Sequence, residues 1–200
     1  MAKIKLTKNE QKKQKDSLKR YERYLPTLML KKQQLQAEIR VVDIRIAEML
    51  RLKERTDADL KKWVAIFGET GVFTPDIVRI TKMLTGEGNV AGVPVPLFEG
   101  AEFQTAEYDY LEKPLWLDAA VDFMKKELLL DLEIQCMEEE QRRLRKELQT
   151  TSQRVNLFEK IKIPEAKAII KKIGIYLGDQ QTAAVVRGKI SKRGMERVGS

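Results

Sequence analysis

Two long series of mostly apolar residues, spaced alternately by three and four positions, constrain the fold of this chain more than any other feature. Because this spacing returns side chains to one stripe of an α-helix, each series predicts the seam of a coiled coil. The first series consists of Leu18, Tyr21, Leu25, Leu28, Leu35, Ile39, Val42, Ile46 and Met49. The second consists of Leu130, Ile134, Met137, Gln141, Leu144, Leu148, Thr151, Val155 and Phe158. We expect two long helices to pair through these seams.

Pro26 lies inside the first series, where a proline removes a backbone hydrogen bond and crowds the preceding turn. The series nevertheless keeps its phase across Pro26, and Lys32 is its interruption. We therefore expect a kink or short break near residues 24–26 within a helix that continues to residue 67. Gly68 and Gly71 offer a natural stop beyond it.

Glycine and proline are frequent between the two series, in residues 68–114. Pro75 predicts the start of a short helix over Asp76–Leu84, and the segment Val90–Phe103 predicts a small two-stranded element. An insert of this length allows the second long helix to run antiparallel to the first.

The second long helix is expected over residues 115–163, with a broader apolar stripe in its first turns. Pro164 suits the first turn of a further helical pattern, because its missing backbone donor costs little there. This pattern comprises Ala166, Ile169, Ile170, Ile173, Tyr176 and Leu177. We expect a helical continuation over residues 164–193, joined to the second helix without a loop, and a flexible tail over 194–200. The predicted fold is mainly all-α: a long antiparallel two-helix coiled coil with a smaller mixed insert, a short helix and a possible β-hairpin, at its distal end.

Positive charge is concentrated at both ends of the chain, whose formal net charge is +8. Residues 1–24 contain nine basic and three acidic residues, and residues 186–200 contain five basic residues and one acidic residue. Because an antiparallel pair brings the termini together, we expect both basic segments at one tip of a rod. Such segments suit nucleic acid, solvent, or an acidic or apolar protein surface, although no nucleic-acid-binding fold is indicated.

The sequence lacks the side chains that most active sites need. It contains no histidine and one cysteine, Cys136, which excludes His-ligated zinc, a Ser-His-Asp triad and an internal disulfide. The glycine-rich stretches Gly68–Gly71 and Gly86–Gly92 lack the spacing of a phosphate-binding loop and indicate turns. The acidic run Glu138–Glu140 points in several directions on a helix and indicates a solvated face. We therefore expect no catalytic residue, no cofactor and no metal site.

A stretch around the end of the second series resembles a family signature. The D subunit of the rotary V-type and archaeal A-type ATPases carries a segment close to T-x-x-R-V-N-x-x-E-x-x-x-I-P. The matching residues in this sequence are Thr151, Arg154, Val155, Asn156, Glu159, Ile163 and Pro164. The block Leu28–Leu35 and an R-x-K-x-x-K pattern formed by Arg187, Lys189 and Lys192 are similar to the family as well.

The resemblance implies a central-stalk rotor of an ATP synthase or ATPase, without an active site of its own. Its partners would be the hexamer of catalytic A and B subunits, the F subunit and the funnel-shaped subunit above the membrane ring. It would couple ATP synthesis or hydrolysis in the hexamer to proton or sodium transport. The sequence contains no run of about 18 apolar residues, so we expect no membrane span and no secretory signal. The expected location is the cytoplasmic face of a membrane, as a peripheral part of the complex.

Three sets of residues are candidates for these roles. The basic residues expected to contact the hexamer are Lys12, Lys13, Lys19, Arg20, Arg187, Lys189 and Lys192. The residues expected to contact the F subunit are Trp116, Val121, Met124 and Leu128. The region Arg154–Asn156 is assigned first to the geometry of the helix junction and second to a partner contact. The alternative function is a free-standing basic coiled-coil scaffold or holdase that binds nucleic acid or a large assembly.

Overall fold

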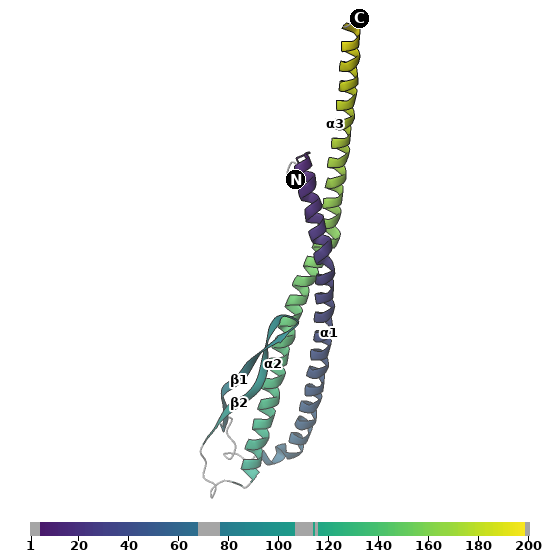
Figure 1. Ribbon diagram of the computed structural model, residues 1–200. Helices are drawn as coiled ribbons and strands as arrows, with labels where there is room; N and C mark the ends of the chain where they lie inside the picture. The colour runs from purple at the N-terminus through teal and green to yellow at the C-terminus, as the bar shows by residue number, and fades with distance from the viewer. Residues whose placement is uncertain (1–4, 68–76, 107–113, 115, 199–200) are drawn as a thin grey trace. The chain divides into compact units, whose positions relative to one another are not determined.

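A computed structural model describes residues 5–67, 77–106, 114 and 116–198 of the chain. These residues form two compact units, which we describe separately. Unit 1 comprises Met1–Lys31 and Thr150–Ser200, and unit 2 comprises Lys32–Gln149. The elements, labelled in Figure 1 except for η1, are α1 (Lys8–Phe67), β1 (Val78–Val90), β2 (Val93–Thr105), α2 (Trp116–Asn156), the π-helix η1 (Leu157–Lys162) and α3 (Ile163–Val198). The expected fold class is confirmed: the protein is mainly helical and carries a two-stranded antiparallel hairpin.

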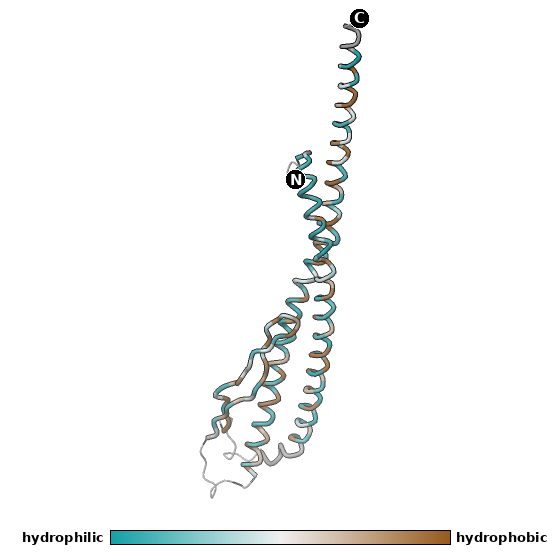
Figure 2. Tube along the Cα trace, in the orientation of Figure 1, coloured by the Kyte–Doolittle hydropathy of each residue, from teal (hydrophilic) through white to brown (hydrophobic). Residues whose placement is uncertain are grey.

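Both predicted seams are observed. Every residue of the two series is buried or half-buried, and Leu35, Val42 and Leu144 are fully buried. In Figure 2 the apolar residues recur along the helices between longer polar stretches. The periodicity of the sequence therefore identified the faces that pack.

Contacts across the helices show an antiparallel pairing in each unit. In unit 2, Arg45 of α1 pairs with Glu140 of α2 at 3.4 Å, and Lys53, further along α1, pairs with the earlier residue Asp131. In unit 1, the ring of Tyr21 lies 5.2 Å from that of Phe158 between centroids. Gln11, which precedes Tyr21, lies beside Gly174, which follows Phe158. A Cβ placed on Gly174 would be 3.4 Å from the side-chain Nε2 of Gln11.

Helix α1 continues through Pro26, whose side chain is exposed. The carbonyl group of Glu22 loses its helical donor at Pro26, and Glu22 is exposed as well, so water can take the place of that donor. Close by, the Thr27 hydroxyl donates a hydrogen bond of 2.8 Å to the carbonyl oxygen of Tyr24.

The hairpin corrects two expectations about the insert. The short helix expected over Asp76–Leu84 is wrong in its described part, because residues 78–84 belong to β1; Asp76 lies outside the described residues. A two-stranded hairpin is confirmed, but its expected place within Val90–Phe103 is wrong: residues 93–103 all belong to β2. The partner strand is β1, paired from Val78 opposite Thr105 to Val90 opposite Val93. Backbone pairing along this whole length outweighs the local helix-start signal of a proline.

The turn of the hairpin consists of Ala91 and Gly92, both with positive φ, 51° and 78°. Two consecutive residues in the left-handed region match the right-handed twist of the paired strands. The backbone N–H of Gly92 also donates to the side-chain oxygen of Asn89 at 2.9 Å. This local chemistry places the turn at residues 91–92.

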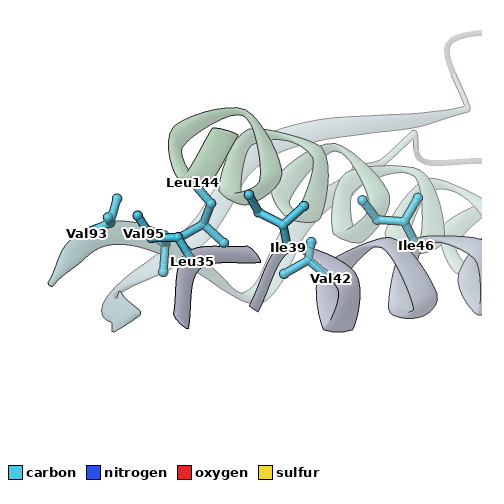
Figure 3. Close-up of a cluster of buried hydrophobic side chains, with 7 residues drawn as sticks. All are labelled: Leu35, Ile39, Val42, Ile46, Val93, Val95 and Leu144. Carbon is cyan, nitrogen blue, oxygen red and sulfur yellow. The ribbon is translucent and has the colours of Figure 1, made fainter. Parts of the chain in front are cut away.

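Two apolar clusters dock the hairpin within unit 2. Near the turn, Val93 and Val95 of β2 pack with the seam of α1 and α2, in the cluster drawn in Figure 3. Its buried members are Leu35, Ile39, Val42, Ile46, Val93, Val95 and Leu144. At the other end of the hairpin, Ile77 and Val78 pack with Leu117 and Val121 of α2.

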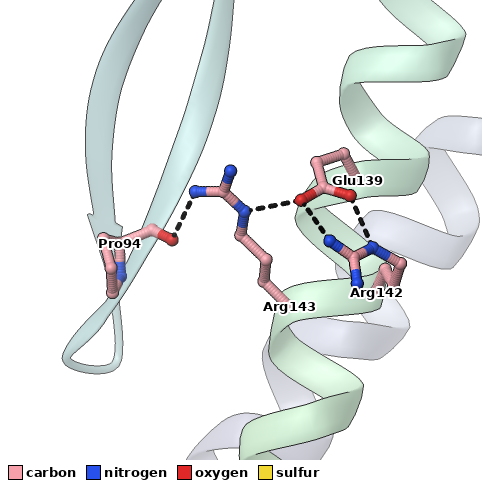
Figure 4. A network of polar contacts seen from close by, with 4 residues as sticks. All are labelled: Pro94, Glu139, Arg142 and Arg143. Atoms are coloured by element: carbon pink, nitrogen blue, oxygen red, sulfur yellow. Dashed lines mark hydrogen bonds and ion pairs between the residues drawn. The ribbon is translucent and has the colours of Figure 1, made fainter.

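A polar network adds a third attachment of the hairpin to α2 (Figure 4). The carboxylate of Glu139 accepts hydrogen bonds of 2.6 and 2.7 Å from Arg142 and of 2.7 Å from Arg143. Arg143 also donates to the carbonyl oxygen of Pro94 in β2 at 3.2 Å. Glu139 therefore orients the guanidinium that reaches the strand.

Candidate functional site

The N-terminal basic candidates form one continuous exposed face in unit 1. Lys12, Lys13, Lys19 and Arg20 are exposed, and together with Asn9 and Asp16 they line an open groove on the surface. Their spacing along α1 places them on neighbouring turns of the same side of the helix. Positive charge on one face is suited to an acidic partner surface.

The C-terminal basic candidates lie on a helix segment that unit 1 leaves uncovered. Arg187, Lys189 and Lys192 are exposed, as is every residue from 178 to 193. The same segment exposes Val185, Val186 and Ile190 by 58%, 49% and 65%. It therefore offers both charge and apolar surface.

The two basic sets lie toward the same end of unit 1 but not at the same level, so the expected common tip needs correction. Gln11 is beside Gly174, and Arg187 follows 13 residues later in α3. At the α-helical rise per residue this distance is about 20 Å. The sequence predicted the direction of the helices correctly, but α3 runs past the start of α1, and apolar spacing does not encode where an unpaired helix ends.

The residues of the family signature divide into an inward and an outward group. Thr151 and Val155 are buried, with 1% and 3% exposure, and Ile163 is half-buried. The outward group is exposed and consists of Arg154, Asn156, Glu159 and Pro164. The signature spans η1, and residues 116–198 are helical throughout, so the expected junction without a loop is confirmed.

The four candidates for contact with the F subunit belong to the second apolar cluster of unit 2. Val121 is only 3% exposed, while Trp116, Met124 and Leu128 are half-buried and pack against that cluster. Part of their apolar surface is therefore covered by Ile77 and Val78, and the half-buried edges remain open to another molecule.

A further apolar face escaped the sequence reasoning. On α1, within unit 2, Val41 and Ile44 are 50% and 59% exposed, and Leu52 is 45% exposed. The spacing of Val41 and Ile44 by three residues was a usable signal for a second stripe. The longer series beside it, which includes Val42 and Ile46, was predicted as the packing face, and the second stripe was not considered.

A small set of charged groups in unit 2 has perturbed pKa values. Burial, and then the negative charge of Asp57, raises the pKa of Glu127. A side-chain hydrogen bond to Asp131 raises the pKa of Lys53. Hydrogen bonds from Arg142 and Arg143 lower the pKa of Glu139 to about 2. The shifts of Glu127 and Lys53 follow from burial and from charges on α1 and α2, and the shift of Glu139 follows from ion pairs within α2. Each shift makes the stability of the fold depend on pH.

Cys136 is buried, and its pKa is raised, first by burial and then by the charge of Glu140. A raised thiol pKa lowers the thiolate fraction, so this group behaves as a small apolar side chain. Within the part of the chain that the structure describes, no three Cys, Asp or Glu side chains gather as a metal site. Across the same residues, no helix is long and apolar enough to cross a membrane.

Long paired helices with open basic and apolar faces characterise a protein that works through contacts with partners. The sequence profile of the ATP synthase D-subunit family matches residues 10–193. The chain is 46% identical over 196 residues to the D subunit of the V-type ATP synthase of Borreliella burgdorferi, covering 96% of this chain and 95% of that protein. It is 33% identical over 197 residues to the D subunit of the V-type ATP synthase of Chlamydia abortus, covering 97% and 94%. This chain therefore belongs to the ATP synthase D-subunit family.

Proposed function

We propose that this chain is the central-stalk rotor of a V/A-type ATP synthase or ATPase. The single observation that carries the proposal is the uncovered half of α3, where all residues from 178 to 193 are exposed. A helix without tertiary contacts is marginal in water, because most helical stability in proteins comes from packing. The exposed Val185, Val186 and Ile190 therefore favour a partner that surrounds this helix.

The partner that suits this segment is the hexamer of A and B subunits. Apolar side chains of α3 would contact its inner surface, while Arg187, Lys189 and Lys192 would pair with acidic groups around it. A second contact would be made by the basic face of Lys12, Lys13, Lys19 and Arg20. It would lie about 20 Å from the first, measured along α3 at the helical rise per residue. The contacts at two levels would hold the shaft against tilting.

Coupling would follow from the different faces of a single shaft. Each A–B pair of the hexamer would meet a different side of the helices, and a conformation is favoured by the contacts that it makes better. Rotation would move these contacts from one pair to the next, so nucleotide chemistry in the hexamer and proton or sodium transport in the membrane ring would proceed in step. Catalysis would stay in the hexamer, and this chain would have no active site.

Unit 2 would supply the contact with the F subunit. The F subunit would bind the half-buried edges of Trp116, Met124 and Leu128, which Val121 supports from within the cluster. The funnel-shaped subunit would connect the stalk to the membrane ring on the cytoplasmic side.

Salt-dependent binding tests the hexamer contact. In one variant, Lys12, Lys13, Lys19 and Arg20 are replaced by Ala; in a second, Arg187, Lys189 and Lys192 are replaced. The control replaces Lys61 and Lys126, which are also exposed but lie in unit 2. We expect about tenfold weaker binding to the purified A–B hexamer for each basic-set variant at low salt, and a smaller loss at high salt, because salt screens exposed charges.

Equal binding by all variants at low salt would count against the proposed contacts. Binding of an RNA that is lost in the same variants, without binding to the hexamer, would favour the alternative scaffold function.

A further inference from the structure

The π-helix η1 lies where the spacing of the helix seam changes in unit 1. From Thr151 to Phe158 two seam steps cover seven residues, whereas from Phe158 to Ala166 two steps cover eight. Ala166 and Ile173 are nevertheless buried, with 3% and 0% exposure. The seam therefore contains one extra residue, and a π-helix is the element that accommodates one extra residue per turn.

The sequence opposes the ordinary α-helical alternative. If residues 157–162 were wound as an α-helix, the following residues would rotate by about 100°, the angle per residue in an α-helix. Glu165 and Lys172, which are now exposed, would then move toward the seam in place of Ala166 and Ile173. Burying these charges would cost more than the π-helix does. Burial of Ala166 and Ile173 therefore stabilises the π-helical register of residues 157–162.

The same segment is weakly held. None of its six residues is buried, and Leu157 and Ile161 are 40% and 54% exposed. Its last turn closes with the wide bond from the N–H of Ile163 to the carbonyl oxygen of Phe158. Pro164 follows and has no N–H to donate, so the turn before it lacks one helical bond. The apolar contact of η1 across the pair is that of the half-buried Phe158 with Tyr21, at 5.2 Å between ring centroids. A segment without a buried residue, next to a missing helical bond, is expected to open locally.

We propose that η1 is a built-in joint, at which the part of α2 and α3 that packs against α1 opens first and yields to bending and twisting. The packing on either side, at Val155 and at Ala166, keeps the seam in register while the joint yields. In the rotor function proposed above, on which this consequence rests, load on α3 would be taken up at residues 157–162. The joint itself is a property of the isolated chain.

Deletion of Lys160 tests the joint directly. Removing one exposed residue from η1 should restore the α-helical spacing and leave Ala166 and Ile173 in the seam. The control is Lys160→Ala, which removes the same side chain and keeps the residue count. Hydrogen exchange of backbone amides in the isolated chain is the measurement, with thermal unfolding followed alongside.

In the parent chain and in Lys160→Ala, the amides of residues 157–163 should exchange about tenfold faster than those of residues 145–155, because local opening precedes global unfolding. In the deletion variant that difference should disappear, with the thermal midpoint retained. Equal exchange along the parent helix, or an unchanged difference in the deletion variant, would overturn the joint. A deletion variant that loses helicity would overturn the register argument.

The assembled complex separates the joint from the rotor function. With A, B and F subunits, the deletion variant should assemble normally and change the rate of ATP hydrolysis, while Lys160→Ala should not. If the parent chain fails to assemble, the rotor function fails and the exchange result still stands. If both variants assemble and hydrolyse ATP like the parent, the mechanical role of the joint is refuted.

Discussion

Replacing Leu144 by alanine should destabilise unit 2 more than any change on its surface. Leu144 is fully buried in the cluster that joins α1, α2 and β2, as Figure 3 shows. The substitution removes three carbon atoms, worth about 0.8 kcal/mol each for transfer from water. The cavity left behind adds to this, so we expect a loss of about 3 kcal/mol in the free energy of unfolding.

Urea unfolding followed by far-ultraviolet circular dichroism measures this loss. The matched control is Ile44→Ala, another large aliphatic residue in the same pair of helices, but 59% exposed. For the control we expect a change of no more than about 0.5 kcal/mol. The urea dependence of the free energy should stay the same in both variants, because neither changes how much surface unfolding exposes.

The reasoning fails if Leu144→Ala costs less than about 1 kcal/mol, which is below the range for a fully buried leucine. It also fails if Ile44→Ala costs as much, since the seam would then not be where the burial places it.

Three further predictions concern charge and exposed apolar surface. Glu127→Gln should stabilise the protein at pH 7 and have no such effect at pH 4: the folded-state pKa of Glu127 is raised, so its ionisation removes stability as pH rises above 4.5, its ordinary value. Glu139→Gln should destabilise at pH 7, with the difference from the parent shrinking as pH falls toward 2, because the folded-state pKa is lowered to about 2 and the carboxylate's stabilisation is lost on protonation. Urea unfolding across pH measures both, and a stabilising effect of Glu139→Gln at pH 7 would contradict the network in Figure 4. Ile190→Asp, at a position 65% exposed, should leave the stability of the isolated chain unchanged and weaken binding to the A–B hexamer about tenfold or more; unchanged binding in a calorimetric titration would refute the contact.

The sequence was sufficient to predict the helix pair because its signal is repeated many times. Val42 and Leu144 each belong to a series with nine members, so a single polar interruption such as Lys32 does not obscure the periodicity. The antiparallel direction followed from the length of the insert. The exact stagger of the helices in unit 1 did not, because it depends on which turns of α1 and α3 fit together.

Elsewhere local signals competed with longer-range packing. The proline before residue 76 suggested a helix, yet residues 78–90 pair with β2, and Val78 packs against α2. For the site, the exposed basic residues were found from charge alone. The π-helix was missed, although the eight-residue step from Phe158 to Ala166 contained its signature.

The rotor function is tested most directly by the stoichiometry of the assembled complex. The chain would be produced with A, B and F subunits and measured by native mass spectrometry, with ATP hydrolysis recorded on the same preparation. The account predicts one copy of this chain for each hexamer of three A and three B subunits, and a hydrolysis rate that changes when the chain is present. Several copies for each hexamer, or a chain that stays apart from a hexamer that forms without it, would contradict the account.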